Sequence, residues 1–182
     1  MQVIFTNDND IIGRLIRWFT KISWVKKGRV SHSAIRYGGD ESEWMVESAE
    51  HGVCPNWWNY FSTRRKIYAK YEVLGIDEVI LEKIVDTELN KVMHDGYDFG
   101  NLFGFAIIIF WYKLTGKRLD NNKFSWRGHF ACTDLLCKIF IEVKKQTGID
   151  YFGNLDPKNT FPEQAFENCE SKPELFRLVT EK

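Results

Sequence analysis

Two consecutive strand-like runs constrain the fold of this chain more than any other feature. "SHSAIRY" (31–37) and "EWMVESA" (43–49) flank the turn-forming stretch "GGDES". Strand-like runs on both sides of a short glycine-containing turn indicate a β-hairpin. A hairpin pairs its strands antiparallel, so the chain is expected to contain an antiparallel sheet.

Helical patterns surround the hairpin. Apolar residues recur at helical spacing in 11–19, after the potential capping side chains of Asn7 to Asp10, and again in 77–96 and 130–148. Asp77 is the predicted N-cap of the second helix and Gly96 its predicted end, while Gly148 ends the third. Further strands are expected at 2–5 and 65–74. The length of 182 residues fits one α+β domain, spanning 1–182.

The charge balance gives no reason to expect a nucleic-acid partner, because the chain has 25 basic and 25 acidic residues. The cluster Arg64, Arg65 and Lys66 is interpreted as solvated loop charge. No secretion signal precedes the first strand, so a cytoplasmic location is expected, with all four cysteines free.

The apolar run "LFGFAIIIFWY" (102–112) is shorter than the roughly 20 residues that a membrane-spanning helix needs. A buried core segment is the favoured interpretation. A wall that faces lipid or an acyl chain is the alternative. An integral membrane segment is not expected.

Cys132 is the leading candidate for a nucleophile. It lies four residues before Leu136, which places it at the start of the third helix and on the helix's buried face. Backbone N–H groups and the helix dipole favour a thiolate at that position, and the same N–H groups can stabilise an oxyanion. The competing interpretation is a buried structural cysteine. Cys137, deeper in the helix, is a weaker candidate.

His32 and Glu47 are the candidates for a base and its orienting acceptor. If Gly38–Glu41 forms the hairpin loop, Tyr37 faces Ser42 and His32 lies directly opposite Glu47. The carboxylate could then fix the imidazole tautomer. A register slip of one residue would move Glu47 to the other face and remove this pairing.

The remaining histidines are weaker candidates. His51 shares the strand parity of Glu47 and is the reserve base, His94 fits a structural role at a helix end, and His129 lies too close to Cys132 in sequence. No metal-site spacing and no nucleotide-binding motif is present, so no cofactor is expected.

The order of these elements, a histidine strand, an acidic strand and then a helix-start cysteine, resembles the circularly permuted branch of the NlpC-type papain-like superfamily. This branch includes YiiX- and YaeF-like bacterial proteins and relatives of lecithin:retinol acyltransferase. The matching segments lie within residues 29–140 and read "SHSAI", "VESAEHGV", "YDFGNLF" and "FACTDLL". Thr133 and Asp134 depart from the Ser and Glu that commonly follow the cysteine in this branch.

The resemblance implies a permuted papain-like fold, with an antiparallel sheet packed against the helix that carries the cysteine. It implies that Cys132 is the nucleophile, His32 the base and Glu47 its orienting partner, with Tyr97 lining the substrate cleft. We therefore expect a cysteine hydrolase that cleaves amide bonds, including those of peptidoglycan stem peptides, through a thioester. The missing secretion signal weighs against a cell-wall substrate.

Two other functions remain open. A lipid or N-acyl hydrolase or acyltransferase, using the same three residues, is suggested by the apolar run and by the relatives. A noncatalytic binding module that keeps the fold is the third interpretation. The expected partner is accordingly a peptide or an acyl substrate.

Overall fold

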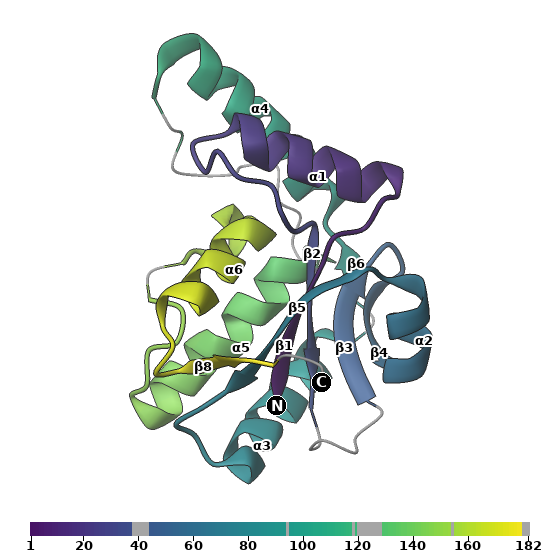
Figure 1. Ribbon diagram of the computed structural model, residues 1–182, viewed down its shortest axis with the longest axis vertical. Coiled ribbons are helices and arrows are strands. Elements are labelled where there is room, and N and C mark those ends of the chain that lie inside the picture. The colour runs from purple at the N-terminus through teal and green to yellow at the C-terminus, as the bar shows by residue number, and fades with distance from the viewer. Residues whose placement is uncertain (38–43, 94, 118, 120–128, 154, 180–182) are drawn as a thin grey trace.

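The computed structural model of the chain describes residues 1–37, 44–93, 95–117, 119, 129–153 and 155–179 (Figure 1). Over these residues the protein is a mixed α+β structure built around a six-stranded antiparallel sheet with the strand order β4-β3-β2-β1-β5-β8. The strands are β1 (Gln2–Thr6), β2 (His32–Arg36), β3 (Trp44–Ala49), β4 (Gly52–Trp57), β5 (Ile67–Val73) and β8 (Phe176–Leu178). A short parallel pair consists of β6 (Gly96–Tyr97) and β7 (His129–Phe130).

Six α-helices and one 3-10 helix lie within the described residues. They are α1 (Ile11–Ile22), α2 (Trp58–Arg64), α3 (Glu78–Val92), α4 (Phe99–Thr115), α5 (Cys132–Thr147), the 3-10 helix η1 (Pro157–Asn159) and α6 (Pro162–Ser171). Among the helices of the described ranges, none is both long enough and apolar enough to cross a bilayer.

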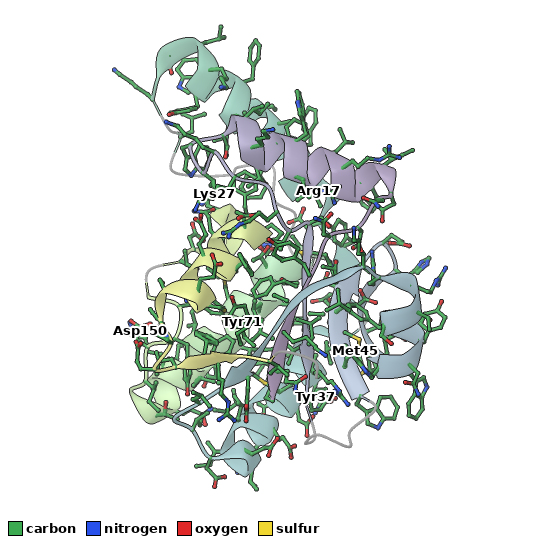
Figure 2. The ribbon with its side chains drawn as sticks, in the orientation of Figure 1. Arg17, Lys27, Tyr37, Met45, Tyr71 and Asp150 are labelled. Atoms are coloured by element: carbon green, nitrogen blue, oxygen red, sulfur yellow. The ribbon has the colours of Figure 1, made fainter. Side chains whose placement is uncertain are left out.

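The sheet is buried on both faces because apolar residues occupy consecutive positions of its central strands. In β1, Val3 and Phe5 point to the larger core, which α3, α5 and α6 close, whereas Ile4 points to the opposite face. On that second face Ile4 packs with Phe61 of α2. Tyr71 of β5 belongs to the larger core (Figure 2). This arrangement follows from the two-residue period of strand side chains.

The predicted helix boundaries are mostly confirmed. The Asp10 carboxylate accepts a hydrogen bond from the Gly13 amide, and the Asp77 carboxylate accepts from two first-turn amides of α3. Gly148 ends α5 in the left-handed conformation, with φ 78°.

The prediction that Gly96 ends the second helix is wrong, because α3 stops at Val92 and Gly96 begins β6. A long-range contact explains the early stop. The Asp95 carbonyl accepts a hydrogen bond of 2.9 Å from the Val53 amide of β4. Gly52, with φ 94°, permits this approach, since a Cβ there would lie 2.2 Å from the Asp95 carbonyl oxygen.

The apolar run is a helix that is buried on one side only. Phe105, Ile108 and Ile109 of α4 are buried, and Phe105 and Ile109 pack with Phe161. Phe110 and Leu114 on the other side of the helix are exposed. The predicted core role is therefore correct for one face of α4, and the other face lacks a cover among the described residues.

The predicted hairpin exists, but its register differs from the prediction by two residues. β2 and β3 pair Ala34, and not His32, with Glu47. The predicted turn at Gly38–Glu41 lies outside the described residues. Because strand side chains alternate with period two, a two-residue shift keeps His32 and Glu47 on the same face of the sheet. They become diagonal neighbours, which a long carboxylate and an imidazole can still bridge.

The segment that leads into β2 is anchored from α6. The buried Glu163 carboxylate accepts hydrogen bonds from the Arg29 amide, at 2.6 Å, and from the Val30 amide, at 3.2 Å. The Arg29 side chain also pairs with Glu163, with 2.6 Å between Nε and Oε1. These bonds fix the backbone just before His32.

Candidate active site

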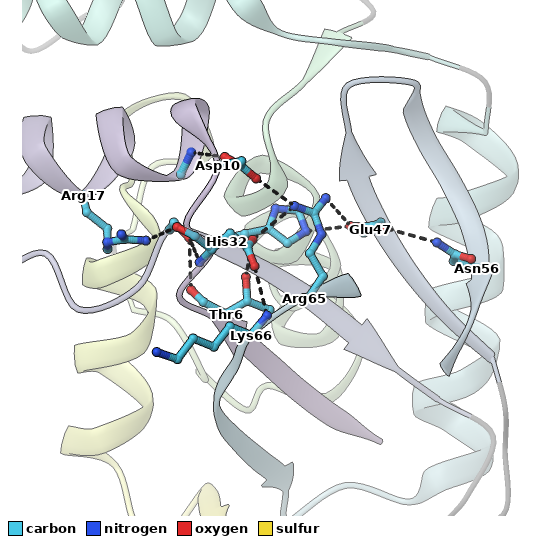
Figure 3. Close-up of polar contacts among 11 residues, drawn as sticks. Thr6, Asp10, Arg17, His32, Glu47, Asn56, Arg65 and Lys66 are labelled. Carbon is cyan, nitrogen blue, oxygen red and sulfur yellow. Dashed lines mark hydrogen bonds and ion pairs between the residues drawn. The ribbon is translucent and has the colours of Figure 1, made fainter. Parts of the chain in front are cut away.

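The structure brings the three predicted residues together from three different elements. Cys132 is the first residue of α5, His32 the first residue of β2, and Glu47 lies within β3. His32 Nε2 lies 2.9 Å from Glu47 Oε2 (Figure 3), and Cys132 lies close enough to His32 for each group to shift the pKa of the other. The exposed fractions are 4% for Cys132, 7% for His32 and 5% for Glu47, so the contacts are shielded from water.

The position of each side chain follows from its local structure. His32 starts its strand, so its ring lies at the end of the sheet where α5 begins. Cys132 starts its helix because Ala131 is extended and the Asp134 carboxylate accepts a hydrogen bond from the Ala131 amide at 3.3 Å. Cys132 Sγ also lies 3.9 Å from the Thr133 hydroxyl oxygen, and the Ser33 backbone helps to lower the pKa of the thiol.

The contact between Cys132 and His32 favours charge on both groups. Burial alone would lower the pKa of His32, but the Cys132 sulfur and the Glu47 carboxylate raise that pKa to about 10. Burial alone would raise the pKa of Cys132, but the His32 imidazolium and the surrounding hydrogen bonds lower it below its ordinary value. The two groups therefore favour the thiolate–imidazolium pair over the neutral thiol–imidazole pair.

The ring orientation of His32 assigns separate tasks to its two nitrogens. Because Glu47 engages Nε2, Nδ1 is the nitrogen that remains for Cys132. A carboxylate on one ring nitrogen and a thiol on the other is the arrangement that proton transfer to and from sulfur requires.

Glu47 is held ionised by further partners that sequence reasoning missed. Asn56 Nδ2 donates to Glu47 Oε1 at 3.2 Å, and Arg65 Nη2 donates to Glu47 Oε2 at 3.3 Å (Figure 3). Burial opposes ionisation, yet the His32 hydrogen bond and the charges of His32 and Arg65 lower the pKa of Glu47 to about 2.

The interpretation of Arg65 as a solvated loop charge is wrong. Arg65 Nη1 lies 3.1 Å from the buried Asp8 carboxylate, and Nη2 reaches Glu47, so the guanidinium bridges two acids. Asp8 is itself fixed by the Thr6 hydroxyl, at 2.7 Å, and by the Lys66 amide, at 3.2 Å. No local sequence pattern marks this link, because it joins residues from three separate segments.

The low pKa of Glu47 predicts a pH-dependent contribution to stability. A depressed carboxyl pKa stabilises the fold above the ordinary value of 4.5, and that contribution is lost as the pH falls toward 2. At 1.36 kcal/mol per pKa unit, Glu47→Gln should cost about 3 kcal/mol of unfolding free energy at neutral pH. Urea unfolding at several pH values measures the difference between the two proteins.

Glu50→Gln is the matched control, because Glu50 is exposed on the same polypeptide stretch. Its effect should stay within about 0.5 kcal/mol at every pH. A Glu47→Gln cost that stayed constant from neutral pH down to pH 2 would show that the carboxylate charge is not what stabilises the fold.

Two cavities border the site, and Tyr97 lines both. A pocket on the histidine side has a mixed lining that includes the charged or polar residues Asp8, Asp10, Glu50, His32 and Arg65. A second pocket touches Cys132 and is mainly apolar; its lining includes Ile16, Phe19, Phe105 and Phe161. Tyr97 and Cys132 thus line the same pocket, and a role of Tyr97 in substrate binding stays a prediction.

A buried charged group supports the start of α5. Lys158 Nζ lies 3.0 Å from Asp134 Oδ2 and 3.3 Å from Asp98 Oδ2. Burial raises the pKa of Asp134 to about 6, although Lys158 opposes this shift. These residues have no sequence signature, since η1 and α5 meet only in the folded chain.

The other candidate residues do not join the site. The exposed His51 lies in the turn between β3 and β4, where its ring is 3.9 Å from Glu50. His94 and the side chain of His129 lie outside the described part of the chain. Cys54, Cys132, Cys137 and Cys169 are all free, and burial raises the pKa of Cys137 far above its ordinary value.

No metal site is found among the described residues, where no three His, Cys, Asp or Glu side chains are grouped to hold an ion. Comparison of the chain with protein-family models and with curated proteins finds no match to either.

Proposed function

We propose that the protein is a cysteine hydrolase that cleaves amide bonds, including those of peptidoglycan stem peptides, through a thioester intermediate. The observation that carries the proposal is the meeting of Cys132, His32 and Glu47 in one buried site, where His32 contacts Glu47 and lowers the pKa of Cys132. A permuted papain-like fold, as the sequence resemblance implies, and a cytoplasmic place of action belong to the same proposal.

The proposed reaction proceeds in two acyl-transfer steps. The Cys132 thiolate attacks the substrate carbonyl, and backbone N–H groups in the first turn of α5 stabilise the oxyanion. The His32 imidazolium gives its proton to the leaving amine, and the neutral ring then takes a proton from the water that hydrolyses the thioester. Glu47 holds the ring in place, while Tyr97 contacts the bound substrate.

A lipid or N-acyl hydrolase or transferase is the second candidate. One observation favours it: the cavity that touches Cys132 is lined mainly by apolar side chains, including Ile16, Phe19 and Phe105. An acyl chain suits such a lining better than a charged stem peptide does. The chemistry at Cys132 would be the same for both substrates.

A substrate panel tests the proposal. Peptides that contain D-amino acids, ordinary L-peptides, N-acyl amines and phospholipids are incubated with the protein and with Cys132→Ala. Cys132-dependent release of amine from the peptides is the expected result. Cys132-dependent release of fatty acid alone would transfer the assignment to the second candidate, and no Cys132-dependent turnover on any substrate would favour a noncatalytic module.

A further inference from the structure

Helices α1 and α4 expose apolar side chains that the active site does not use. The two helices pack together in one layer at the end of the molecule away from α3 (Figure 1). On α1, Ile11 is 73% exposed and Trp18 54%; on α4, Phe110 is 66% exposed and Leu114 67%. Exposed apolar side chains gathered on adjacent elements mark surfaces that bind membranes or other molecules.

Helical spacing places the exposed residues of each helix in a stripe. Ile11, Leu15 and Trp18 are four and three residues apart on α1, and Phe110 and Leu114 are four apart on α4. The side of α1 that faces the protein is a different one, formed by Gly13, Ile16 and Thr20. The stripes are therefore outer faces of both helices rather than parts of the core.

A basic row accompanies the apolar stripe of α1. Arg14 and Lys21 are exposed, and Arg17 (Figure 2) donates to the Asp8 carbonyl. A helix with separate apolar and Lys/Arg-rich faces, and with a tryptophan in the apolar face, is typical of segments that lie in a membrane interface. Aromatic side chains such as Trp18 and Trp111 suit the boundary between head groups and acyl chains.

The local charge around these helices contrasts with the balanced charge of the whole chain. The sequence has no acidic residue between Asp10 and Asp40, and none between Asp98 and Asp120, although acidic and basic residues are equal at 25 each overall. Exposed cations in the described parts of these stretches include Arg14, Lys21, Lys26, Lys113 and Lys117. This charge is complementary to anionic lipid head groups and would repel the same face of a second copy.

We propose that the outer faces of α1 and α4 bind the surface of an anionic lipid bilayer. The apolar stripes enter the interface, and the neighbouring cations contact the head groups. The inner sides of the same helices supply Ile16, Phe19 and Phe105 to the cavity beside Cys132. Binding to the bilayer requires no catalysis, so it is testable whether or not the proposed function holds.

The test is co-sedimentation with vesicles, using full-length protein that carries Cys132→Ala to prevent turnover. Vesicles of phosphatidylcholine alone are compared with vesicles that also contain phosphatidylserine. We expect binding to the phosphatidylserine vesicles, a blue shift of tryptophan fluorescence, and at least a tenfold loss of binding at high salt.

Two double variants separate the contributions to binding. Leu15→Glu with Leu114→Glu removes apolar contact, and Arg14→Glu with Lys21→Glu reverses charge; each should weaken binding about tenfold or more. Val79→Glu, at a similarly exposed apolar position on α3, is the matched control and should bind as the parent does. Thermal unfolding checks that each variant folds.

Three results would overturn the proposal. In the first, both double variants fold and bind vesicles as tightly as the parent protein. In the second, the parent binds equally to vesicles with and without phosphatidylserine. In the third, the parent does not bind vesicles. If the parent instead forms dimers that the Leu15→Glu and Leu114→Glu variant dissociates, the surface is a self-association face and the bilayer assignment is wrong.

Discussion

Replacing Cys132 with alanine is expected to lower turnover of the preferred substrate by about 10⁴-fold or more. The reason is that Cys132 alone forms the bond to the substrate carbonyl, so no other group in the site can replace it. Steady-state rates for wild type and variant, measured with the substrate identified by the panel, give the ratio. Binding of the substrate should change far less than turnover, because the cavity walls remain.

Cys137→Ala provides the matched control on the same helix. Cys137 is fully buried, lies five residues after Cys132, and has a pKa raised by burial, so its thiol is not available as a nucleophile. The control should retain turnover within a few-fold and lose some stability through the small cavity it creates. Equal loss of turnover in both variants would mean that packing of α5, rather than the Cys132 thiolate, supports the activity.

Replacing His32 with alanine is expected to slow alkylation of Cys132 by iodoacetamide at neutral pH by roughly 10–100-fold. The imidazolium is the main favourable influence on the Cys132 thiolate, and without it burial raises the thiol pKa. In wild type, alkylation should stay fast well below the ordinary thiol pKa of about 8.5. The rate of modification at Cys132, followed by mass spectrometry from pH 5 to pH 10, reports this difference.

Glu47→Gln is the graded comparison for this experiment. It keeps the shape of the side chain but removes one of the two charges, those of Cys132 and Glu47, that raise the pKa of His32, so the Cys132 alkylation profile should shift by less than in His32→Ala. Turnover requires the imidazolium as well as the thiolate, and it should therefore decline as the pH rises through the His32 pKa of about 10. Identical alkylation profiles in wild type and His32→Ala would remove His32 from its assigned role.

The hairpin illustrates what alternation in a sequence can and cannot predict. His32 and Glu47 lie on the same face of the sheet because strand side chains alternate with period two. The predicted register was wrong by two residues, and a shift of that size leaves the face unchanged. The register itself depends on the length and conformation of the turn, which side-chain alternation does not encode. The contact between His32 and Glu47 was therefore predictable from the sequence, whereas the residue paired directly with Glu47 was not.

Capping residues were predictable because their cause is local. Asp10 and Asp77 bond to amides within three residues, and Cys132 begins a helix whose apolar stripe is visible in the sequence. The end of α3 was not predictable, since the Asp95 carbonyl bonds to Val53 of a distant strand. Local chemistry predicts where these helices begin, and tertiary contacts decide where α3 stops.

The ionic surroundings of the site could not be derived from sequence patterns. Arg65 bridges Asp8 and Glu47, and Lys158 joins Asp98 to Asp134, in each case across elements that meet only after folding. Runs such as "TRRK" resemble ordinary surface charge. The role of Arg65 as the ionic partner of Asp8 and Glu47 is recognisable only when the positions of those buried carboxylates are known.

The most direct test of the account is capture of the acyl intermediate after rapid acid quenching of a reaction with the preferred substrate. We predict a mass increase equal to one substrate acyl group, located by fragmentation at Cys132, cleaved by hydroxylamine, and absent from Cys132→Ala. Turnover accompanied by an adduct at another residue, or Cys132→Ala protein that still forms the adduct, would contradict the assignment of Cys132 as the nucleophile.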